Sequence, residues 1–312
     1  MAIILDGTKL AKSIKDKVRE DVRRLRERGI DTGLAILLVG RNPASSLYFS
    51  ATLKASKGIG ITVYEYRLPE DTTMNEILNL IHNINHDERI NGLLILFPLP
   101  RNINARRVVN SLAPEKDVDG LGAISVGRLA ADETVAQLFQ KSDEKVNNEK
   151  LFVSAFSFLP CTPFGVIRLL DSYGVDLKGK DAVVVGKSLA VGKPLAHMLL
   201  AKEATVTICH KETSDLSYYV KRADIVCSAT GVRGLIKGDM LKKGAVVVDI
   251  GINVMSDKQI VGDVDFSSAC ETASMITPVP GGVGPVTIAM LLENTVRSAQ
   301  RHELLSSPFV QL

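Results

Sequence analysis

Tryptophan is absent from this sequence of 312 residues, and aromatic residues of all kinds make up only 5% of it. Cysteine is also scarce, and Cys161, Cys209, Cys227 and Cys270 do not have the spacing of a metal site. Cys209 and Cys227 lie in strand-like apolar runs, so we expect them to be buried, reduced thiols. The cysteines therefore do not indicate a disulfide scaffold.

Long apolar runs and a strong excess of one charge are absent as well. The longest apolar stretch, residues 92–100, contains proline and is far shorter than the roughly 20 residues of a membrane span. The N-terminus has no basic segment followed by a long apolar core, so no signal peptide is expected. A net charge of +3 is too small to indicate nucleic acid but suits an anionic small ligand. We therefore expect a cytoplasmic protein without a membrane or nucleic-acid partner.

The first 120 residues alternate between helical and strand-like patterns. With 46% hydrophobic and 23% charged residues, the composition is that of a globular protein, and the length suggests two domains. Short apolar strands are predicted at 34–39, 62–66 and 92–97, and helices at 43–57 and 72–86, after a charged helix that ends near Gly29. Such alternation indicates a parallel sheet covered on both faces, an α/β fold.

The second half repeats this alternation more regularly. Strands are predicted at 181–186, 204–209, 223–227 and 245–249, with a helix from Pro194 to Leu200 after the first of them. A last helix is predicted from Pro285 to about Gln300. Residues 131–150 are polar with little periodicity, which favours a solvated insertion between the domains.

A glycine-containing loop lies between the strand at 181–186 and the helix that follows. It contains Gly186, Lys187, Ser188, Val191 and Gly192. The spacing differs from the usual G-x-G-x-x-G, because Ser188 occupies the place of the second glycine. Many βα turns contain two glycines, but within a βαβαβ pattern this loop predicts a dinucleotide pyrophosphate at the helix N-terminus.

The charge near this loop indicates which dinucleotide is bound. NAD sites usually carry an acidic residue at the end of the second strand. Here that strand ends in Cys209-His210-Lys211, and Lys187 lies in the first loop. Two cations favour the 2′-phosphate of NADP. The alternatives are that each lysine is a solvated surface charge and that His210 is structural, and Glu212 adds an acid close by.

Residues 278–285, Pro-Val-Pro-Gly-Gly-Val-Gly-Pro, lead into an apolar run. Three prolines and three glycines among them exclude a helix or a central strand. Glycine lets the backbone approach a flat or charged ligand, and the helix that follows starts with free N–H groups. A rigid turn between domains is the alternative interpretation.

Taken together, these segments resemble the FolD family of methylenetetrahydrofolate dehydrogenase/methenyltetrahydrofolate cyclohydrolases. The matching motifs occur in the order of that family and cover nearly the whole chain. They are Val39-Gly40 with Asn42-Pro-Ala-Ser45 and Tyr48, Pro98-Leu-Pro100, Lys116-Asp-Val-Asp-Gly120, Gly127-Arg-Leu129, Pro160-Cys-Thr-Pro163, Val185-Gly-Lys-Ser188, Val191-Gly-Lys-Pro194, Gly262-Asp-Val-Asp265 and the Pro-Gly run.

The resemblance implies two α/β domains with a cleft between them. The folate domain would comprise residues 1–130 and the C-terminal helix, 286–312. Residues 131–158 would be a polar linker, and residues 159–285 a Rossmann-type NADP-binding domain with a parallel sheet. The substrate would be 5,10-methylenetetrahydrofolate, which gives a hydride to NADP, and the protein would be a homodimer.

The resemblance also implies site residues. Asp119 would bind the amino-pyrimidine edge of the pterin, a role that suits a buried carboxylate, and Tyr48 would pack against the substrate. Turn chemistry around Gly120 is the alternative for Asp117 and Asp119. Further substrate contacts would come from Pro278, Val279, Gly281 and Gly282. The implied cofactor-binding residues are Thr162, Gly186, Lys187, Ser188, Val191, Gly192, His210, Lys211, Gly251, Ile252, Gly284 and Thr287.

Two departures from the family pattern fall on its cyclohydrolase residues. The family has a lysine four residues after the tyrosine, where this chain has Thr52, and a glutamine before Pro-Leu-Pro, where it has Leu96. Threonine does not titrate near neutral pH, and leucine forms no hydrogen bond, so proton transfer loses both groups. Lys54 is turned by roughly 200° from the Thr52 face of the predicted helix and is a poor replacement.

Three hypotheses follow. The first is an NADP-dependent methylenetetrahydrofolate dehydrogenase with weak or absent cyclohydrolase, since hydride transfer depends mainly on positioning. The second is a bifunctional enzyme in which another group moves protons. The third is a non-catalytic paralogue that binds folate and NADP. Smaller departures at Leu121-Gly122 and Ser125 lie near Asp119.

Overall fold

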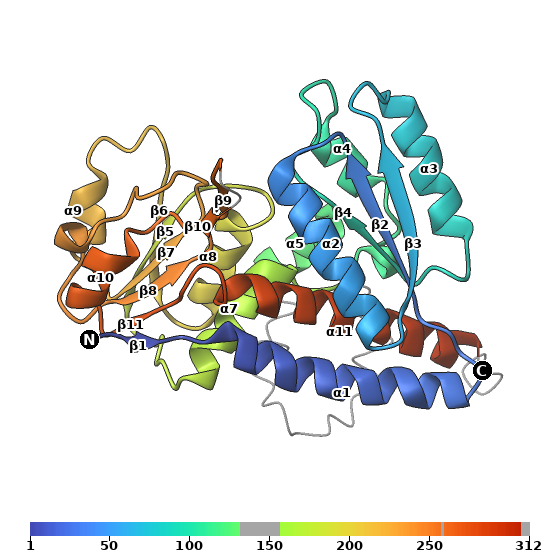
Figure 1. Cartoon of the computed structure of the whole chain (residues 1–312), viewed down its shortest axis with the longest axis horizontal. Coiled ribbons are helices and arrows are strands. Elements are labelled where there is room, and N and C mark those ends of the chain that lie inside the picture. Colours follow the sequence, from blue (N-terminus) through green and yellow to red (C-terminus); the bar gives the residue numbers. More distant parts are fainter. Residues whose placement is uncertain (132–156, 257–258, 307–312) are drawn as a thin grey trace. The chain divides into compact units, whose positions relative to one another are not determined.

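The computed structural model describes residues 1–131, 157–256 and 259–306 (Figure 1). The chain forms two compact units. Among the described residues, the six-stranded unit comprises 1–12, 129–131 and 160–287. The three-stranded unit comprises 13–128, 157–159 and 288–306. Among the described residues, no helix has both the length and the apolar character needed to cross a membrane.

All strands of the six-stranded sheet run parallel to their neighbours. Their order across the sheet is β1-β11-β8-β7-β5-β6. In chain order the strands are β1 (Ile3–Ile4), β5 (Asp181–Val185), β6 (Thr205–Cys209), β7 (Ile225–Ser228), β8 (Val246–Asp249) and β11 (Met275–Ile276). The chain passes from β5 to β6 on one side and then to β7 on the other, so the strand order reverses between β5 and β7. This is where nucleotides bind in open parallel sheets.

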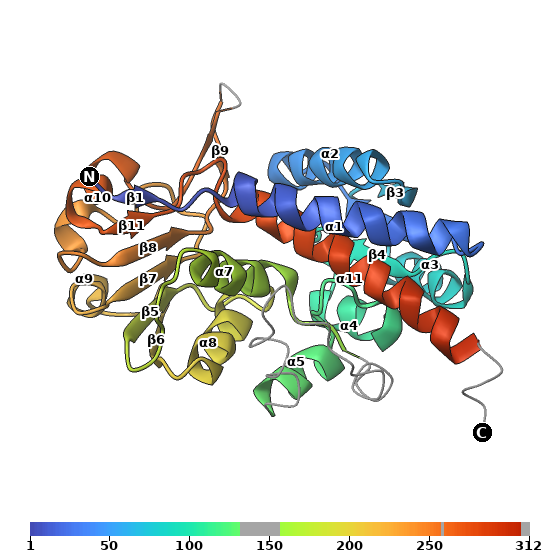
Figure 2. The same ribbon diagram turned by 90° about the horizontal axis from the view of Figure 1, so that it is seen from below.

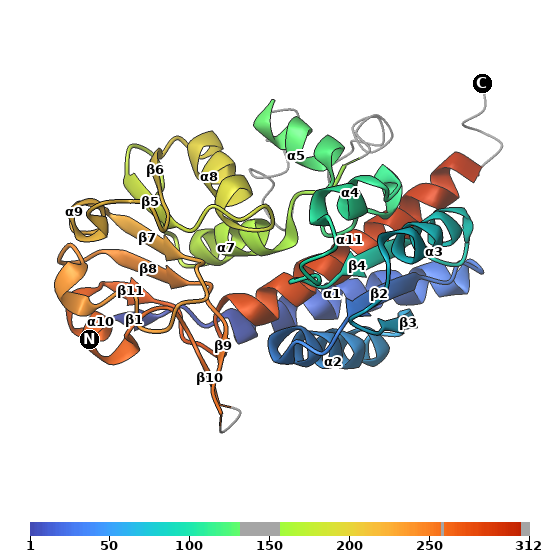
Figure 3. The same cartoon turned by 90° about the horizontal axis from the view of Figure 1, so that it is seen from above.

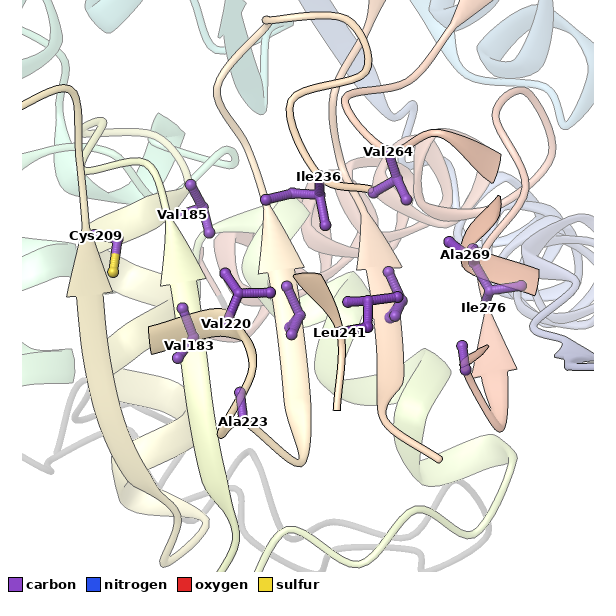
Figure 4. Close-up of a cluster of buried hydrophobic side chains, with 13 residues drawn as sticks. Val183, Val185, Cys209, Val220, Ala223, Ile236, Leu241, Val264, Ala269 and Ile276 are labelled. Atoms are coloured by element: carbon purple, nitrogen blue, oxygen red, sulfur yellow. The ribbon is translucent and has the colours of Figure 1, made fainter. Parts of the chain in front are cut away.

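Helices cover both faces of this sheet (Figures 2 and 3). One face carries α7 (Cys161–Ser172) and α8 (Gly192–Ala201), and the other carries α9 (Leu216–Val220) and α10 (Phe266–Thr272). Beneath α9 and α10, buried aliphatic side chains from four strands form a core with Val220 and Ala269 (Figure 4). A 3₁₀ turn, Gly238–Met240, packs against α10, and β9 (Asn253–Val254) pairs with β10 (Ile260–Val261) as an antiparallel hairpin.

The three-stranded sheet has the order β3-β2-β4, also parallel. The central strand β2 (Gly33–Val39) is apolar and buried along its whole length, and it lies between β3 (Thr62–Leu68) and β4 (Gly92–Ile95). Helix α2 (Pro43–Gly58) packs on β2 and β3. The other elements are α3 (Met74–His86), α4 (Ala105–Asn110), α5 (Ala123–Ala130) and the 3₁₀ turn Pro114–Lys116.

Two long helices, α1 (Gly7–Glu27) and α11 (Val283–Ser306), run for most of their length through the three-stranded unit. There they lie side by side (Figures 1 and 2). Apolar residues at helical spacing form the buried stripe of α1: Ile14, Val18, Val22 and Leu25. The exposed face carries ion pairs three and four residues apart, as for Arg23 with Glu20 and Glu27.

The predicted α/β class, the parallel sheets and the strands of both halves are confirmed. The short strands β1 and β11 were not predicted, because two-residue strands have no periodicity. Since β1 pairs with β11, residues 1–12 belong to the six-stranded unit rather than with the predicted range 1–130. Most of the predicted linker, 131–158, lies outside the described residues.

The prediction that the Pro-Gly run excludes a helix was wrong at its end. Helix α11 begins at Val283, two residues before Pro285, and extends to Ser306. Proline is tolerated in the first helical turn, because the N–H that it lacks would have no partner within the helix there. The prediction of buried, reduced Cys209 and Cys227 is confirmed.

Candidate functional site

The glycine loop after β5 forms a tight connection to α8. Gly186 has a φ of 120°, which L side chains rarely adopt, and a Cβ there would overlap the carbonyl of Ala229. A Cβ at Gly192 would overlap the carbonyl of Gly186. These contacts explain why both positions are glycine. In this loop, backbone packs directly on backbone.

Ser188 closes this loop with its side chain. Its Oγ accepts hydrogen bonds from the N–H groups of Val191 and Gly192, at 3.1 and 3.3 Å. Two of the amides at the start of α8, predicted to meet a pyrophosphate, are therefore bound to Ser188. The Ser188 hydroxyl keeps its own proton to donate. Lys187, in the same loop, is exposed.

The turn after β6 holds His210 and Lys211. The N–H of His210 donates to Thr213 Oγ1 at 2.9 Å, and His210 Nδ1 accepts from the N–H of Glu212 at 3.3 Å. The His210 ring thus takes part in a local turn. Lys211 Nζ lies 3.4 Å from Glu212 Oε1, and both side chains are largely exposed, so this pair adds little stability. Glu212, the acid beside the predicted 2′-phosphate site, is therefore paired with Lys211.

The Pro-Gly run is held by the first residues of the chain. The carbonyl of Gly281, whose φ is 110°, accepts from the N–H groups of Gly7 and Thr8, at 3.0 and 3.1 Å. A Cβ at Gly7 would overlap the Gly282 carbonyl. The start of α1 is therefore capped by this run, which fixes Gly281 and Gly282. Pro278 and Val279 are half-buried.

Two predicted cofactor residues that are distant in sequence meet at the start of α11. Thr287 Oγ1 lies 3.2 Å from Thr162 Oγ1, which belongs to the first turn of α7. Gly165 in α7 packs close to Val286 and Thr287. Gly284 has open space around the position of a Cβ. The structure therefore brings Thr162 and Thr287 together within the six-stranded unit.

Helix α2 carries Tyr48 and one of the two departures from the family pattern, Thr52. Asn42 caps the helix by accepting from the N–H of Ser45, and Ser45 Oγ donates to the carbonyl of Phe97 at 2.8 Å. This bond links the start of α2 to the segment after β4, where Leu96 lies buried. Tyr48, on the next turn of α2, is half-buried.

Thr52 is 0% exposed, and within the described residues its Oγ1 has no hydrogen-bond partner. Lys54 is exposed on another side of α2, as predicted. Leu96 is 3% exposed. At these two positions the unit offers a hydroxyl and an alkyl group, neither of which exchanges protons near neutral pH.

The loop around Asp119 is built on its neighbour Asp117. The Asp117 carboxylate accepts from the N–H groups of Leu121 and Gly122, at 3.0 and 2.9 Å, and from Ser125 Oγ at 2.6 Å. Burial raises the pKa of Asp117 to about 6, although these donors favour its charged form. Asp117 is therefore structural, which matches the turn chemistry given as its alternative.

The residues on either side of Asp119 are held in place. Asn294 Nδ2 donates to the carbonyl of Val118 at 2.9 Å, and the N–H of Gly120, whose φ is 69°, donates to the carbonyl of Asp117 at 2.8 Å. Asp119 itself is half-buried. A side chain between two fixed residues is suited to the orientation of a ligand.

Two buried aspartates of the six-stranded unit, Asp249 and Asp263, were not predicted to be site residues. Gly251, a predicted cofactor residue, has no room for a Cβ because Asp263 packs against it. The signal was present in Gly262-Asp-Val-Asp265, where a glycine directly precedes an acid. Without the fold, nothing indicated which loops these carboxylates bind.

Comparisons with known proteins agree with both units. The family model described as "Tetrahydrofolate dehydrogenase/cyclohydrolase, catalytic domain" matches residues 5–119. The model described as "Tetrahydrofolate dehydrogenase/cyclohydrolase, NAD(P)-binding domain" matches residues 160–303. The predicted dinucleotide cofactor is consistent with the second match.

Relatives cover nearly the whole chain. The bifunctional protein FolD of Geotalea daltonii is 46% identical over 301 residues, which are 96% of this chain and 100% of that protein. The crystal structure of FolD from Campylobacter jejuni has a TM-score of 0.85 and 45% identity, covering 97% of this chain and 100% of that one. The Trypanosoma brucei enzyme, solved with NADP and an inhibitor, has a TM-score of 0.85 and 33% identity, covering 97% of this chain and 98% of that one. The chain belongs to the tetrahydrofolate dehydrogenase/cyclohydrolase family.

Proposed function

We propose that this chain oxidises 5,10-methylenetetrahydrofolate to 5,10-methenyltetrahydrofolate with NADP and hydrolyses that product weakly or not at all. Family membership and the glycine loop after β5 support the oxidation. One observation carries the second part: the family lysine is replaced by Thr52, which is 0% exposed and has an unpartnered hydroxyl among the described residues.

The six-stranded unit suits a dinucleotide phosphate. The glycines at both ends of the loop, Gly186 and Gly192, allow a tight turn from β5 to α8, because a Cβ at either would overlap a backbone carbonyl. A tight turn of this kind brings a helix N-terminus to the place where a pyrophosphate binds in such folds. Lys187 and Lys211 would attract the 2′-phosphate, and Ser188 retains a proton to donate. When bound, NADP accepts the hydride from the methylene bridge. Gly251, Ile252, Thr162 and Thr287 would orient the nicotinamide end.

The three-stranded unit would orient the folate. We propose that Asp119 accepts hydrogen bonds from the amino-pyrimidine edge of the pterin, because that edge is rich in donors and a carboxylate only accepts. Tyr48 would pack against the substrate. The carbonyl of Val118 and the N–H of Gly120 are both hydrogen-bonded, which limits movement of Asp119.

The two reactions make different demands on the protein. Hydride loss from the bridge carbon produces a delocalised cation and needs no base at carbon, so orientation of the reactants supplies most of the catalysis. Hydrolysis adds water to that cation, releases a proton and breaks a carbon–nitrogen bond, so it gains from a group that exchanges protons near neutral pH. Thr52 and Leu96 supply no such group.

The test follows NADPH and methenyltetrahydrofolate separately when the purified protein is given 5,10-methylenetetrahydrofolate and NADP. We expect both to rise together and the methenyl product to persist. If NADPH rises but the methenyl product disappears faster than it does without protein, the chain is bifunctional. If neither rises with NADP or with NAD, the chain is a non-catalytic paralogue.

We also propose that the protein is a cytoplasmic homodimer, as the family resemblance implies. Light scattering of the purified protein should give twice the mass of the 33.7 kDa chain. A monomeric mass at working concentration would contradict the dimer without affecting the proposed reaction.

A further inference from the structure

Asp263 is a fully buried carboxylate to which the reaction proposed above gives no part. It is 0% exposed and follows the β9–β10 hairpin. Its Oδ2 accepts from Ser228 Oγ at 3.1 Å, from the N–H and Oγ1 of Thr230 at 2.6 and 2.9 Å, and from the N–H of Gly231 at 3.2 Å. Its Oδ1 accepts from Asn253 Nδ2 at 3.1 Å. All five groups donate, so the site requires an acceptor at both oxygens.

These donors lie in the two connections that line the carboxyl edge of the sheet. Ser228 ends β7, and Thr230 and Gly231 belong to the loop after it. Asn253 begins β9, directly after the predicted cofactor residues Gly251 and Ile252. Asp263 therefore fixes the β7 loop and the β8–β9 connection with one side chain.

The β7 loop is one wall of the predicted dinucleotide site. Strand order reverses between β5 and β7, and ligands of open parallel sheets bind at that reversal. Within this loop the carbonyl of Ala229 lies where a Cβ of Gly186 would be. A shift of Thr230 or Gly231 would thus reach the glycine loop directly.

Asp249 holds Asp263 from the other side. The Asp249 carboxylate accepts from the N–H groups of Gly251, Asp263 and Val264, at 3.0, 3.0 and 2.9 Å. Gly251 and Gly262 have no room for a Cβ, because each would overlap one of the two carboxylates. The pair thus fastens both ends of the β9–β10 hairpin to the sheet.

We infer that Asp263 is a positioning residue for the dinucleotide, acting through the β7 loop and the Gly251–Asn253 connection. The inference rests on the proposed use of NADP. It predicts an effect on the KM for NADP that is separate from the KM for the folate and from kcat at saturating NADP, because the folate-orienting residues lie elsewhere in the chain.

The test compares Asp263→Asn with Asp265→Asn in the full chain. Asparagine puts an NH₂ group against N–H or O–H donors at position 263. At position 265, where the exposed acid caps α10, it is as good a cap as aspartate. For Asp263→Asn we expect the KM for NADP to rise by about tenfold or more, with kcat and the folate KM changing by less than about twofold. Asp265→Asn should change none of the three.

A KM for NADP that is unchanged in folded Asp263→Asn would overturn the inference, and so would a general loss of kcat and of affinity for both substrates. If Asp263→Asn does not fold, the same measurements are made on Ser228→Ala and on Thr230→Val. Each of these variants removes one hydroxyl donor to Asp263. A rise of about threefold in the KM for NADP supports the inference, and no rise in either variant refutes it.

Direct titration of NADPH fluorescence keeps the inference distinct from the proposed reaction. If the wild type binds NADPH but forms none from the folate, the proposed reaction fails, and the dissociation constants of the same variants still test Asp263. If the wild type does not bind NADPH, both fail.

Discussion

Two regions of the molecule are built by different means. The first is the carboxyl edge of the six-stranded sheet around Gly186 and Asp263, called here the nucleotide edge because the dinucleotide is proposed to bind there. The second is the α2 face of the three-stranded unit, which comprises α2 and the segment after β4 that contains Leu96. At the nucleotide edge, shape comes from backbone packed on backbone, as at Gly186 and Gly192, and from carboxylates that fix loops. On the α2 face, the scaffold is equally well fastened, for example by Ser45 on Phe97. Its reactive positions, however, depend on the side chains at 52 and 96. The family scaffold is therefore retained in both units, and the two departures at the reactive positions, Thr52 and Leu96, lie in the three-stranded unit.

The largest expected effect is on hydrolysis, when the family side chains are restored at positions 52 and 96. Thr52→Lys combined with Leu96→Gln is expected to raise the rate of methenyltetrahydrofolate hydrolysis by about 10²- to 10⁴-fold, the range that a positioned proton-transfer group contributes. The rate is measured as the decay of methenyltetrahydrofolate absorbance.

The matched control is Ser50→Lys, which adds a lysine on the exposed face of the same helix and should leave hydrolysis unchanged. If the folded double variant hydrolyses no faster than the wild type, the loss of cyclohydrolase cannot be assigned to Thr52 and Leu96.

The next largest expected effect is on NADPH affinity, and it tests the glycine loop after β5. Gly186→Ala should weaken NADPH binding by about 100-fold, equivalent to about 3 kcal/mol, because alanine is strained at this φ and its Cβ overlaps the Ala229 carbonyl. Fluorescence titration gives the dissociation constant. Gly179→Ala, where φ is 68° and no neighbour lies within 4 Å, should cost some stability but not affinity. Equal losses of affinity in both would argue for a general effect on folding.

Within the described ranges, both units contain a buried carboxyl whose pKa is raised to about 6. It is Asp117 in the three-stranded unit and Asp249 in the six-stranded unit. Burial is the main cause in both. In the unfolded chain such a group titrates near 3.8, so between about pH 4 and 6 the unfolded state loses its proton first. The free energy of unfolding should therefore fall as pH rises through this window, by up to about 2 to 3 kcal/mol for each group.

The measurement is the free energy of unfolding in urea at several pH values, compared between the wild type and Asp117→Asn or Asp249→Asn. Each variant should fall less than the wild type from pH 4 to 6. Comparison with the wild type is needed because acids with lowered pKa values, such as Asp224, have the opposite slope. A parallel profile in a variant would show that its aspartate titrates normally.

The smallest effect concerns the Thr52 hydroxyl on α2, which has no hydrogen-bond partner in the part of the chain that the structure describes. Thr52→Val should raise the free energy of unfolding by about 1 kcal/mol, because a buried hydroxyl without a partner costs its desolvation. Ser45→Ala, on the same buried face, should lower it by about 1 kcal/mol through loss of the bond to Phe97. Urea unfolding measures both. Destabilisation by Thr52→Val would mean that the hydroxyl has a partner in solution.

Sequence patterns located the strands, because buried parallel strands are uninterrupted apolar runs such as 34–39 and 181–185. Strands β1 and β11 were missed, since two residues have no period and their pairing is a long-range event. The start of α11 was misplaced because proline was treated as a boundary, although the first helical turn accepts it. Asp249 and Asp263 had no local signal of their partners, which for Asp263 include Ser228, 35 residues away in sequence.

The sequence by itself determined the family, the α/β class, the dinucleotide loop and the absence of a titratable group at positions 52 and 96, because these depend on residue identity and local spacing. Only the tertiary structure decided that Thr52 is buried without a described partner, that Asp117 braces a turn, and that Asp263 joins two loops at the nucleotide edge. Burial and hydrogen-bond partnership arise when distant segments pack together, and no local pattern encodes them.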